Sequence, residues 1–181
     1  PGHGDTEVDS HLGLPLITKS KKALLENELY PFQQLINEGV PAIMAGHLSI
    51  PSLADGDTIP SSLSKMMLKN LLRDEMNFKG VVISDALNMH AVSKNYTVHG
   101  ELEWLAFDAG NDVLCFAEHI EAGINTILKN ASDSQIEESF ERLWKLKEIA
   151  FKSLHENYKL SNASLLNEEI AMASLKLLKG A

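Results

Sequence analysis

Short apolar runs alternate along the chain with longer segments in which apolar residues recur every three or four positions. Two of the runs, residues 41–45 and 80–84, are rich in branched side chains, and each follows a helix-like segment that ends at a glycine, Gly39 or Gly80. Residues 113–116 form a third run. This alternation is typical of βα units around a parallel sheet, so we predict an α/β fold with strands in these three places.

Five further segments have the period of an amphipathic helix. In the second of them Ser64 is expected to act as the N-cap, and Met67, Leu68, Leu71 and Leu72 form one apolar stripe that we expect in the core. The predicted helices cover residues 31–38, 65–72, 101–109, 119–129 and 134–155.

Composition excludes some classes of function. The net charge is −9, and the 16 basic residues are scattered among 25 acidic ones, which argues against a nucleic-acid surface. No stretch approaches the roughly 18 uninterrupted apolar residues that a membrane span requires. The single cysteine, Cys115, lies in an apolar run and has no partner for an internal disulfide. A start at Pro-Gly-His-Gly without an initiator Met leads us to expect a longer parent protein.

Polar residues stand at the carboxyl ends of the predicted strands, where barrels and open α/β sheets place reactive groups. His47 follows the first strand and Asp85 the second. Three βα units are too few for a closed eight-stranded barrel, which takes about 250 residues. We therefore predict a partial TIM (β/α)8 barrel made of its carboxy-terminal βα units.

The densest cluster of reactive side chains lies at residues 3–11, and three interpretations of it are open. Asp9 could orient His11 by a direct hydrogen bond, which would make the imidazole a proton shuttle. Alternatively, His3, Asp5, Asp9 and His11 could ligate a divalent metal. The third interpretation is a polar surface turn.

Asp85 and His47 each allow two interpretations. Asp85 follows an almost wholly apolar strand, which suits a nucleophile or general base, but an N-cap for residues 86–92 explains an Asp there equally well. His47 could line a pocket or could satisfy a buried backbone group.

Several motifs resemble those of a known family. Residues 1–6, Pro-Gly-His-Gly-Asp-Thr, and residues 9–11, Asp-Ser-His, resemble the Lys-His-Phe-Pro-Gly-His-Gly-Asp-Thr signature of glycoside hydrolase family 3, in its β-N-acetylglucosaminidase branch. Further matching segments follow in family order at residues 28–32, 43–47, 60–64, 72–73, 78–85 and 109–112.

The resemblance implies roles for individual residues. It assigns the glycosyl nucleophile to Asp85, the acid/base to His11 and the orientation of that imidazole to Asp9. It also implies substrate contacts from His3, His47 and Met89. The expected reaction is retaining hydrolysis of a terminal β-linked N-acetylglucosamine, from peptidoglycan-derived fragments, without a metal or other cofactor. A β-glucosidase of the same family and a metal-dependent hydrolase are the alternatives.

The resemblance also implies the domain organisation. Residues 1–156 are expected to form the carboxy-terminal half of the barrel, and residues 157–181 a linker and the start of a second α/β domain. The expected partners are thus a carbohydrate substrate, the remainder of the barrel and that second domain.

Overall fold

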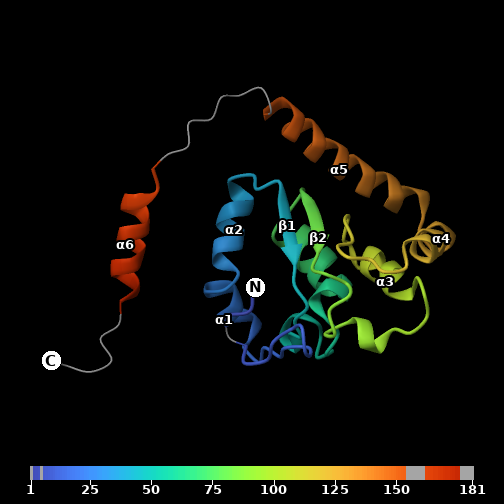
Figure 1. Ribbon diagram of the computed structural model, residues 1–181, viewed down its shortest axis with the longest axis horizontal. Helices are drawn as coiled ribbons and strands as arrows, with labels where there is room; N and C mark the ends of the chain where they lie inside the picture. Colours follow the sequence, from blue (N-terminus) through green and yellow to red (C-terminus); the bar gives the residue numbers. More distant parts are fainter. Residues whose placement is uncertain (1, 5, 154–161, 176–181) are drawn as a thin grey trace. The chain divides into compact units, whose positions relative to one another are not determined.

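The computed structural model describes residues 2–4, 6–153 and 162–175, which fall into two compact units, residues 1–149 and 150–181. Figure 1 shows the elements of the chain. The strands are β1 (Ala42–Ala45) and β2 (Val81–Ser84). The α-helices are α1 (Lys21–Glu26), α2 (Tyr30–Asn37), α3 (Glu101–Ala109), α4 (Ile120–Asn130), α5 (Asp133–Ser153) and α6 (Ser164–Ser174). The remaining helical turns are η1 (Pro51–Leu53), η2 (Ser61–Leu63), η3 (Met66–Glu75) and η4 (Ser93–Asn95).

The two strands pair in parallel, in a register that sets Ala42 opposite Val81 and Ala45 opposite Ser84. Both strands were predicted within one residue of their bounds. The third predicted strand, at residues 113–116, is wrong: Val113 makes only an isolated parallel bridge to Ile83. Its ladder ends early because Phe116 has a left-handed φ of 47°, and because the Cys115 N–H bonds to the Ser84 hydroxyl instead of a strand carbonyl.

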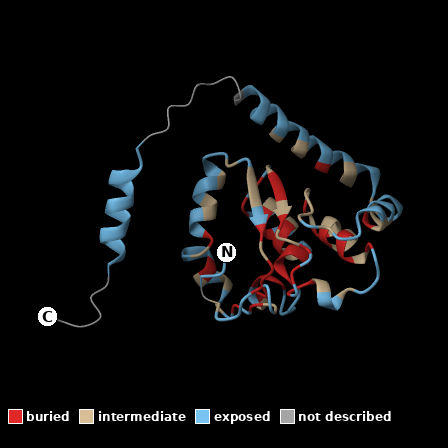
Figure 2. Ribbon diagram, in the orientation of Figure 1, coloured by how far each residue is buried: buried red, intermediate tan, exposed pale blue. Residues whose placement is uncertain are grey.

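The main apolar core lies between one face of the sheet and helices α1, α2 and η3. Figure 2 marks the buried residues in red. The stripe predicted on η3 is confirmed, since all four of its residues are buried. The Met67 N–H lies 3.4 Å from the Ser64 hydroxyl, as expected for a cap. This helix is wound more widely than an α-helix: the Met76 N–H bonds to the carbonyl of Leu71, five residues earlier.

The other predicted helices correspond to α2, α3, α4 and α5. The bounds of α3 match the prediction, those of α2 and α4 differ by one residue, and α5 begins one residue earlier than predicted; its predicted last residues, 154–155, lie outside the described part. On α5 the apolar side chains are only partly covered, because Phe140 and Ile149 are exposed. Phe140 stacks on Trp144 with ring centroids 5.8 Å apart. Helix α6 begins at Ser164, inside the range predicted to hold a linker and the start of a second domain; residues 157–161 and 176–181 of that range lie outside the described part. The domain boundary at residue 157 stays a prediction.

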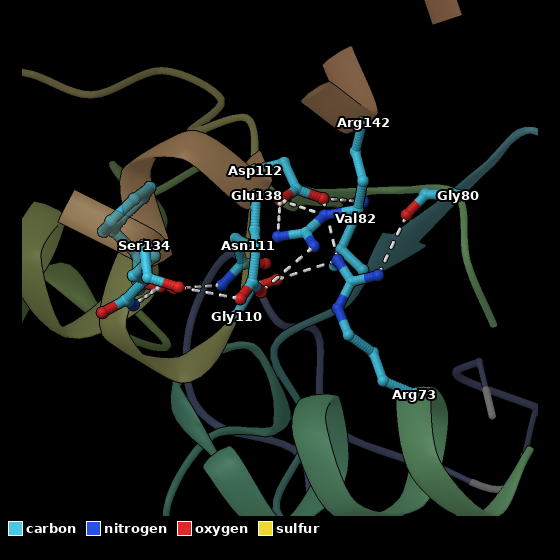
Figure 3. Close-up of polar contacts among 12 residues, drawn as sticks. Arg73, Gly80, Val82, Gly110, Asn111, Asp112, Ser134, Glu138 and Arg142 are labelled. Carbon is cyan, nitrogen blue, oxygen red and sulfur yellow. Dashed lines mark hydrogen bonds and ion pairs between the residues drawn. The ribbon is translucent and has the colours of Figure 1, made fainter. Parts of the chain in front are cut away.

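A buried carboxylate connects the amino-terminal end of β2 to two helices (Figure 3). The Asp112 side chain is 1% exposed and accepts the Val82 N–H at 2.8 Å. It pairs with Arg73 of η3 at 2.8 Å and with Arg142 of α5 at 2.9 Å. Arg73 also donates to the Gly80 carbonyl, and burial lowers the pKa of its guanidinium. These contacts fix the strand that ends at Asp85.

Candidate active site

Parallel pairing brings the carboxyl ends of β1 and β2 to one edge of the sheet. His47 follows β1 after Gly46, and Asp85 follows β2 directly, with its N–H bonded to the Ala45 carbonyl at 2.9 Å. The loop that begins the chain reaches the same edge: a Cβ built on Gly46 would lie 3.5 Å from the His3 ring. The sheet edge and this loop therefore meet.

A cleft with a volume of about 510 Å³ lies where they meet. It brings together five of the six residues that the sequence indicated for catalysis or substrate binding. These are His3, Asp9, His11, Asp85 and Met89, joined in the wall by Thr6, Glu7, Val8 and Ser10. His47 does not line this cleft.

Asp9 and His11 form a hydrogen-bonded pair in the cleft. Asp9 Oδ1 lies 2.8 Å from His11 Nδ1 and accepts the His11 backbone N–H at 2.9 Å. These two bonds from His11 lower the pKa of the Asp9 carboxyl. An ionised carboxylate can only accept, so Nδ1 carries a hydrogen and Nε2 is the ring atom left for a substrate. Both side chains are largely open to solvent, with exposed fractions of 58% for Asp9 and 75% for His11.

His3 is held by the same loop. Its Nε2 lies 3.0 Å from the hydroxyl of Ser10, which is 5% exposed, and its carbonyl accepts hydrogen bonds from the Thr6 N–H and hydroxyl. Ser10 is a site residue that the residue types alone did not indicate, although it lies inside the Asp-Ser-His motif. It spans the loop and keeps the His3 ring on the cleft wall.

Asp85 is half-buried, and its Oδ1 accepts the N–H of the next residue, Ala86, at 2.8 Å. Residues 86–92 form a series of turns and no helix. The N-cap interpretation of Asp85 is therefore wrong, because a cap bonds to an N–H two or three residues ahead in a helix. The carboxylate is available to the cleft.

His47 is fully buried, and both of its ring nitrogens have partners. Nδ1 lies 2.6 Å from the Ser62 hydroxyl, and Nε2 lies 3.0 Å from the Ala86 carbonyl. Burial lowers the pKa of the imidazole. Of the two interpretations, the structure shows the satisfied buried group. Ser62 is the second residue whose role sequence reasoning missed: it lies in the family-like segment at residues 60–64, but 15 positions from His47, and nothing in that segment indicates the contact.

The metal interpretation needs several ligands from the loop at residues 3–11 to converge. Asp5 lies outside the described residues, His3 bonds to Ser10, and His11 bonds to Asp9. Within the described ranges no group of three His, Cys, Asp or Glu residues is arranged to hold a metal ion. In the same ranges no helix is long and apolar enough to cross a membrane.

Comparisons with known proteins identify similar sequences and structures. A beta-hexosaminidase of Neisseria meningitidis serogroup C is 38% identical over 114 residues, which are 63% of this chain and 30% of that protein. The structure of a glycoside hydrolase family 3 beta-N-acetylglucosaminidase from Paenibacillus sp. matches with a TM-score of 0.77 and 32% identity, over 90% of this chain and 32% of the other. The structure of Zn-bound CbsA from Thermotoga neapolitana matches with a TM-score of 0.73 and 29% identity, over 96% of this chain and 38% of the other.

The model of the glycosyl hydrolase family 3 N terminal domain matches residues 1–146. That domain is an α/β barrel of the TIM type, which confirms the predicted fold class, and the chain spans about a third of the length of the relatives described above. The chain belongs to glycosyl hydrolase family 3.

Proposed function

We propose that this chain carries the nucleophile and the acid/base pair of a retaining β-N-acetylglucosaminidase. The observation that carries the proposal is the shared cleft: Asp85, Asp9 and His11 line one cavity at the carboxyl edge of the sheet. Most glycosidases use two carboxyl groups, one as nucleophile and one as acid/base. In this proposal Asp85 is the nucleophile, and the acid/base is the His11 imidazole, which Asp9 orients. The similarity to a beta-hexosaminidase and to a beta-N-acetylglucosaminidase supports the same activity.

In the first step, an Asp85 carboxylate oxygen attacks the anomeric carbon and the bond to the leaving oxygen breaks. Protonated His11 gives its Nε2 proton to that oxygen, while Nδ1–H stays bonded to Asp9. The products are a glycosyl ester on Asp85 and the free alcohol. The Asp9 contact at Nδ1 leaves Nε2 as the ring nitrogen that can give up the proton.

In the second step, neutral His11 takes a proton from water through Nε2, and the water oxygen attacks the anomeric carbon. The ester bond breaks, Asp85 returns as a carboxylate, and the sugar leaves with its original anomeric configuration. Each residue therefore ends the cycle in its starting state.

The substrate is a terminal β-linked N-acetylglucosamine on a peptidoglycan-derived fragment. This chain supplies His3 and Met89 as cleft walls that can contact the sugar. Because it spans about a third of its relatives, we infer that the remaining barrel strands and a second domain contribute further sugar contacts in the parent protein. We also infer that the chain by itself has low activity.

The test is hydrolysis of an aryl β-N-acetylglucosaminide by the parent protein that contains this chain. Asp85→Asn is expected to abolish formation of the glycosyl ester. His11→Ala is expected to slow turnover by about 10²–10⁴-fold, the usual contribution of a general acid/base. Asp9→Asn should also slow turnover, because a neutral amide oxygen accepts the hydrogen bond from Nδ1–H less strongly than a charged carboxylate does.

Matched controls separate these effects from general damage. Asp57→Asn makes the same change on an exposed Asp outside the cleft, and His90→Ala makes it on an exposed His. Both controls should keep full turnover. Activity that survives in Asp85→Asn would refute the assignment of the nucleophile, and a β-glucoside cleaved faster than the N-acetylglucosaminide would favour the β-glucosidase alternative.

A metal-dependent hydrolase is the second candidate, favoured by the zinc-bound neighbour from Thermotoga neapolitana. It requires loop ligands such as His3, Asp9 and His11 to exchange their present partners for the ion. Turnover that disappears with a chelator and returns with zinc would support it. Turnover that a chelator leaves unchanged supports the Asp85 and His11 mechanism.

A further inference from the structure

His47 has no exposed surface that a substrate could contact. It is nevertheless connected to the proposed nucleophile by a single residue, Ala86. Its Nε2 is 3.0 Å from the carbonyl oxygen of Ala86, and its Nδ1 is 2.6 Å from the Ser62 hydroxyl. The ring is 0% exposed. A buried imidazole with two short contacts is held in one orientation.

The two contacts fix which tautomer is present. A carbonyl oxygen can only accept, so Nε2 must carry the hydrogen that bonds to Ala86. In a neutral ring Nδ1 is then an acceptor, and the Ser62 hydroxyl donates to it. Burial lowers the pKa of His47 and so favours the neutral ring. The hydrogen bond to Ala86 and the nearby Asp85 carboxylate oppose this shift, and the nearby His3 adds to it.

The residue after the proposed nucleophile is thus held at both of its backbone polar groups. The Ala86 N–H donates to Asp85 Oδ1 at 2.8 Å, and the Ala86 carbonyl accepts from His47. Ser62 is itself fixed, since its carbonyl accepts the side-chain amide of Asn111 at 2.7 Å. The contacts therefore form a continuous path from Asn111 through Ser62, His47 and Ala86 to the Asp85 carboxylate.

We propose that His47 is a positioning residue for Asp85: held as its Nε2–H tautomer by the Ala86 carbonyl and oriented by Ser62, it fixes the turn that aims the carboxylate into the cleft. The inference rests on the proposed function, because it takes Asp85 as the nucleophile. It replaces the expected substrate contact of His47 with an indirect role.

The first test reads the tautomer directly. Nitrogen-15 NMR of the imidazole should show a protonated Nε2 and an unprotonated Nδ1 for His47 at neutral pH. Ser62→Ala removes the donor to Nδ1 but leaves the Ala86 carbonyl in place, so Nε2 should stay protonated in that variant. A ring that is protonated at Nδ1 in the wild type would overturn the proposal.

The second test measures rates in the parent protein, with an aryl β-N-acetylglucosaminide. His47→Leu should slow formation of the glycosyl ester by about 10–10²-fold with little change in KM, since a displacement of about 1 Å can cost 10²-fold. His47→Gln keeps an N–H donor near the position of Nε2 and should restore most of the rate. Leu24→Ala, which opens a cavity at a fully buried site outside the cleft, controls for lost stability and should keep the wild-type rate.

A double variant separates this inference from the proposed function. Asp85→Gly should be inactive, and azide should restore cleavage by attacking the anomeric carbon in place of the carboxylate. In that background His47→Leu should have no further effect, because there is no carboxylate to aim. A further loss in the double variant, or a wild-type rate in His47→Leu alone, would overturn the role of His47, whereas activity in Asp85→Gly without azide would overturn the proposed function.

Discussion

We expect Asp112→Asn to lower the free energy of unfolding strongly, although asparagine has nearly the same side-chain shape as aspartate. The substitution keeps a side-chain oxygen for the Val82 N–H but removes the negative charge that two arginines share (Figure 3). Arg73 and Arg142 are 15% and 19% exposed, so solvent compensates for little of the lost partner. Removing one partner of a buried ion pair typically costs about 3–5 kcal/mol, and the retained hydrogen bond places this variant near about 3 kcal/mol.

Urea denaturation followed by circular dichroism measures this cost. With an unfolding slope of about 2 kcal/mol per M, a loss of about 3 kcal/mol lowers the midpoint by roughly 1.5 M. Such a loss is a large part of the roughly 5–15 kcal/mol that stabilise a typical domain.

Two further variants make the experiment decisive. Glu138→Gln removes the exposed partner of Arg142, which lies 3.7 Å away, and should cost less than about 1 kcal/mol. The double variant Arg142→Leu with Asp112→Asn should lose less stability than the sum of the two single variants, because Arg142→Leu removes one of the two arginine charges that Asp112→Asn leaves without a carboxylate. An Asp112→Asn variant within about 1 kcal/mol of wild type would refute the view that this carboxylate holds β2 in place.

Two other predictions concern stability. Gly100→Ala should lower the free energy of unfolding by about 2 kcal/mol or more in urea denaturation, because Gly100 has a φ of 85° and a Cβ there would lie 2.5 Å from the Ala122 carbonyl oxygen. Gly56→Ala is the control, since Gly56 has a φ of 92° but open space around it, and its loss of stability should be clearly smaller. Equal losses would contradict the steric reasoning. Hydrogen bonds from Lys19 and then from a neighbouring amide lower the pKa of the Glu28 carboxyl from 4.5 to about 2. The ionised Glu28 carboxylate therefore stabilises the fold above pH 4.5, and this contribution is lost as the pH falls toward 2. Glu28→Gln should make the stability fall less steeply between pH 4.5 and 2. An unchanged slope of stability against pH in acid titration would refute this prediction.

The outcome of the sequence predictions follows from how local each signal is. The stripe from Met67 to Leu72 predicted a buried helix correctly, because the period of apolar residues is set by the neighbouring turns of the same helix. The strand predicted at residues 113–116 was wrong, because pairing depends on which groups its neighbour offers, and Ser84 offered a hydroxyl to the Cys115 N–H. Short apolar runs carry no information about their partners.

At the site, residue type and position gave the nucleophile as one of two interpretations of Asp85 and the Asp9 and His11 pair as one of three interpretations of its loop. The family resemblance assigned these roles. Residue type and position placed His47 equally well in a pocket or in the core, and only burial decided between them. Ser62 lies in the family-like segment at residues 60–64, but the sequence did not predict its role, since its hydroxyl acquires that role only where the chain folds back onto His47.

By itself, then, the sequence determined the alternation of strands and helices, the strand end that carries Asp85 and the short-range bond between Asp9 and His11, all of which depend on residues close along the chain. The tertiary structure alone decided that the loop at residues 3–11 meets Asp85 in one cleft, and that Asp112 finds arginines 39 and 30 positions away. The physical reason is that burial and long-range charge pairing depend on packing between distant segments, which no local period encodes.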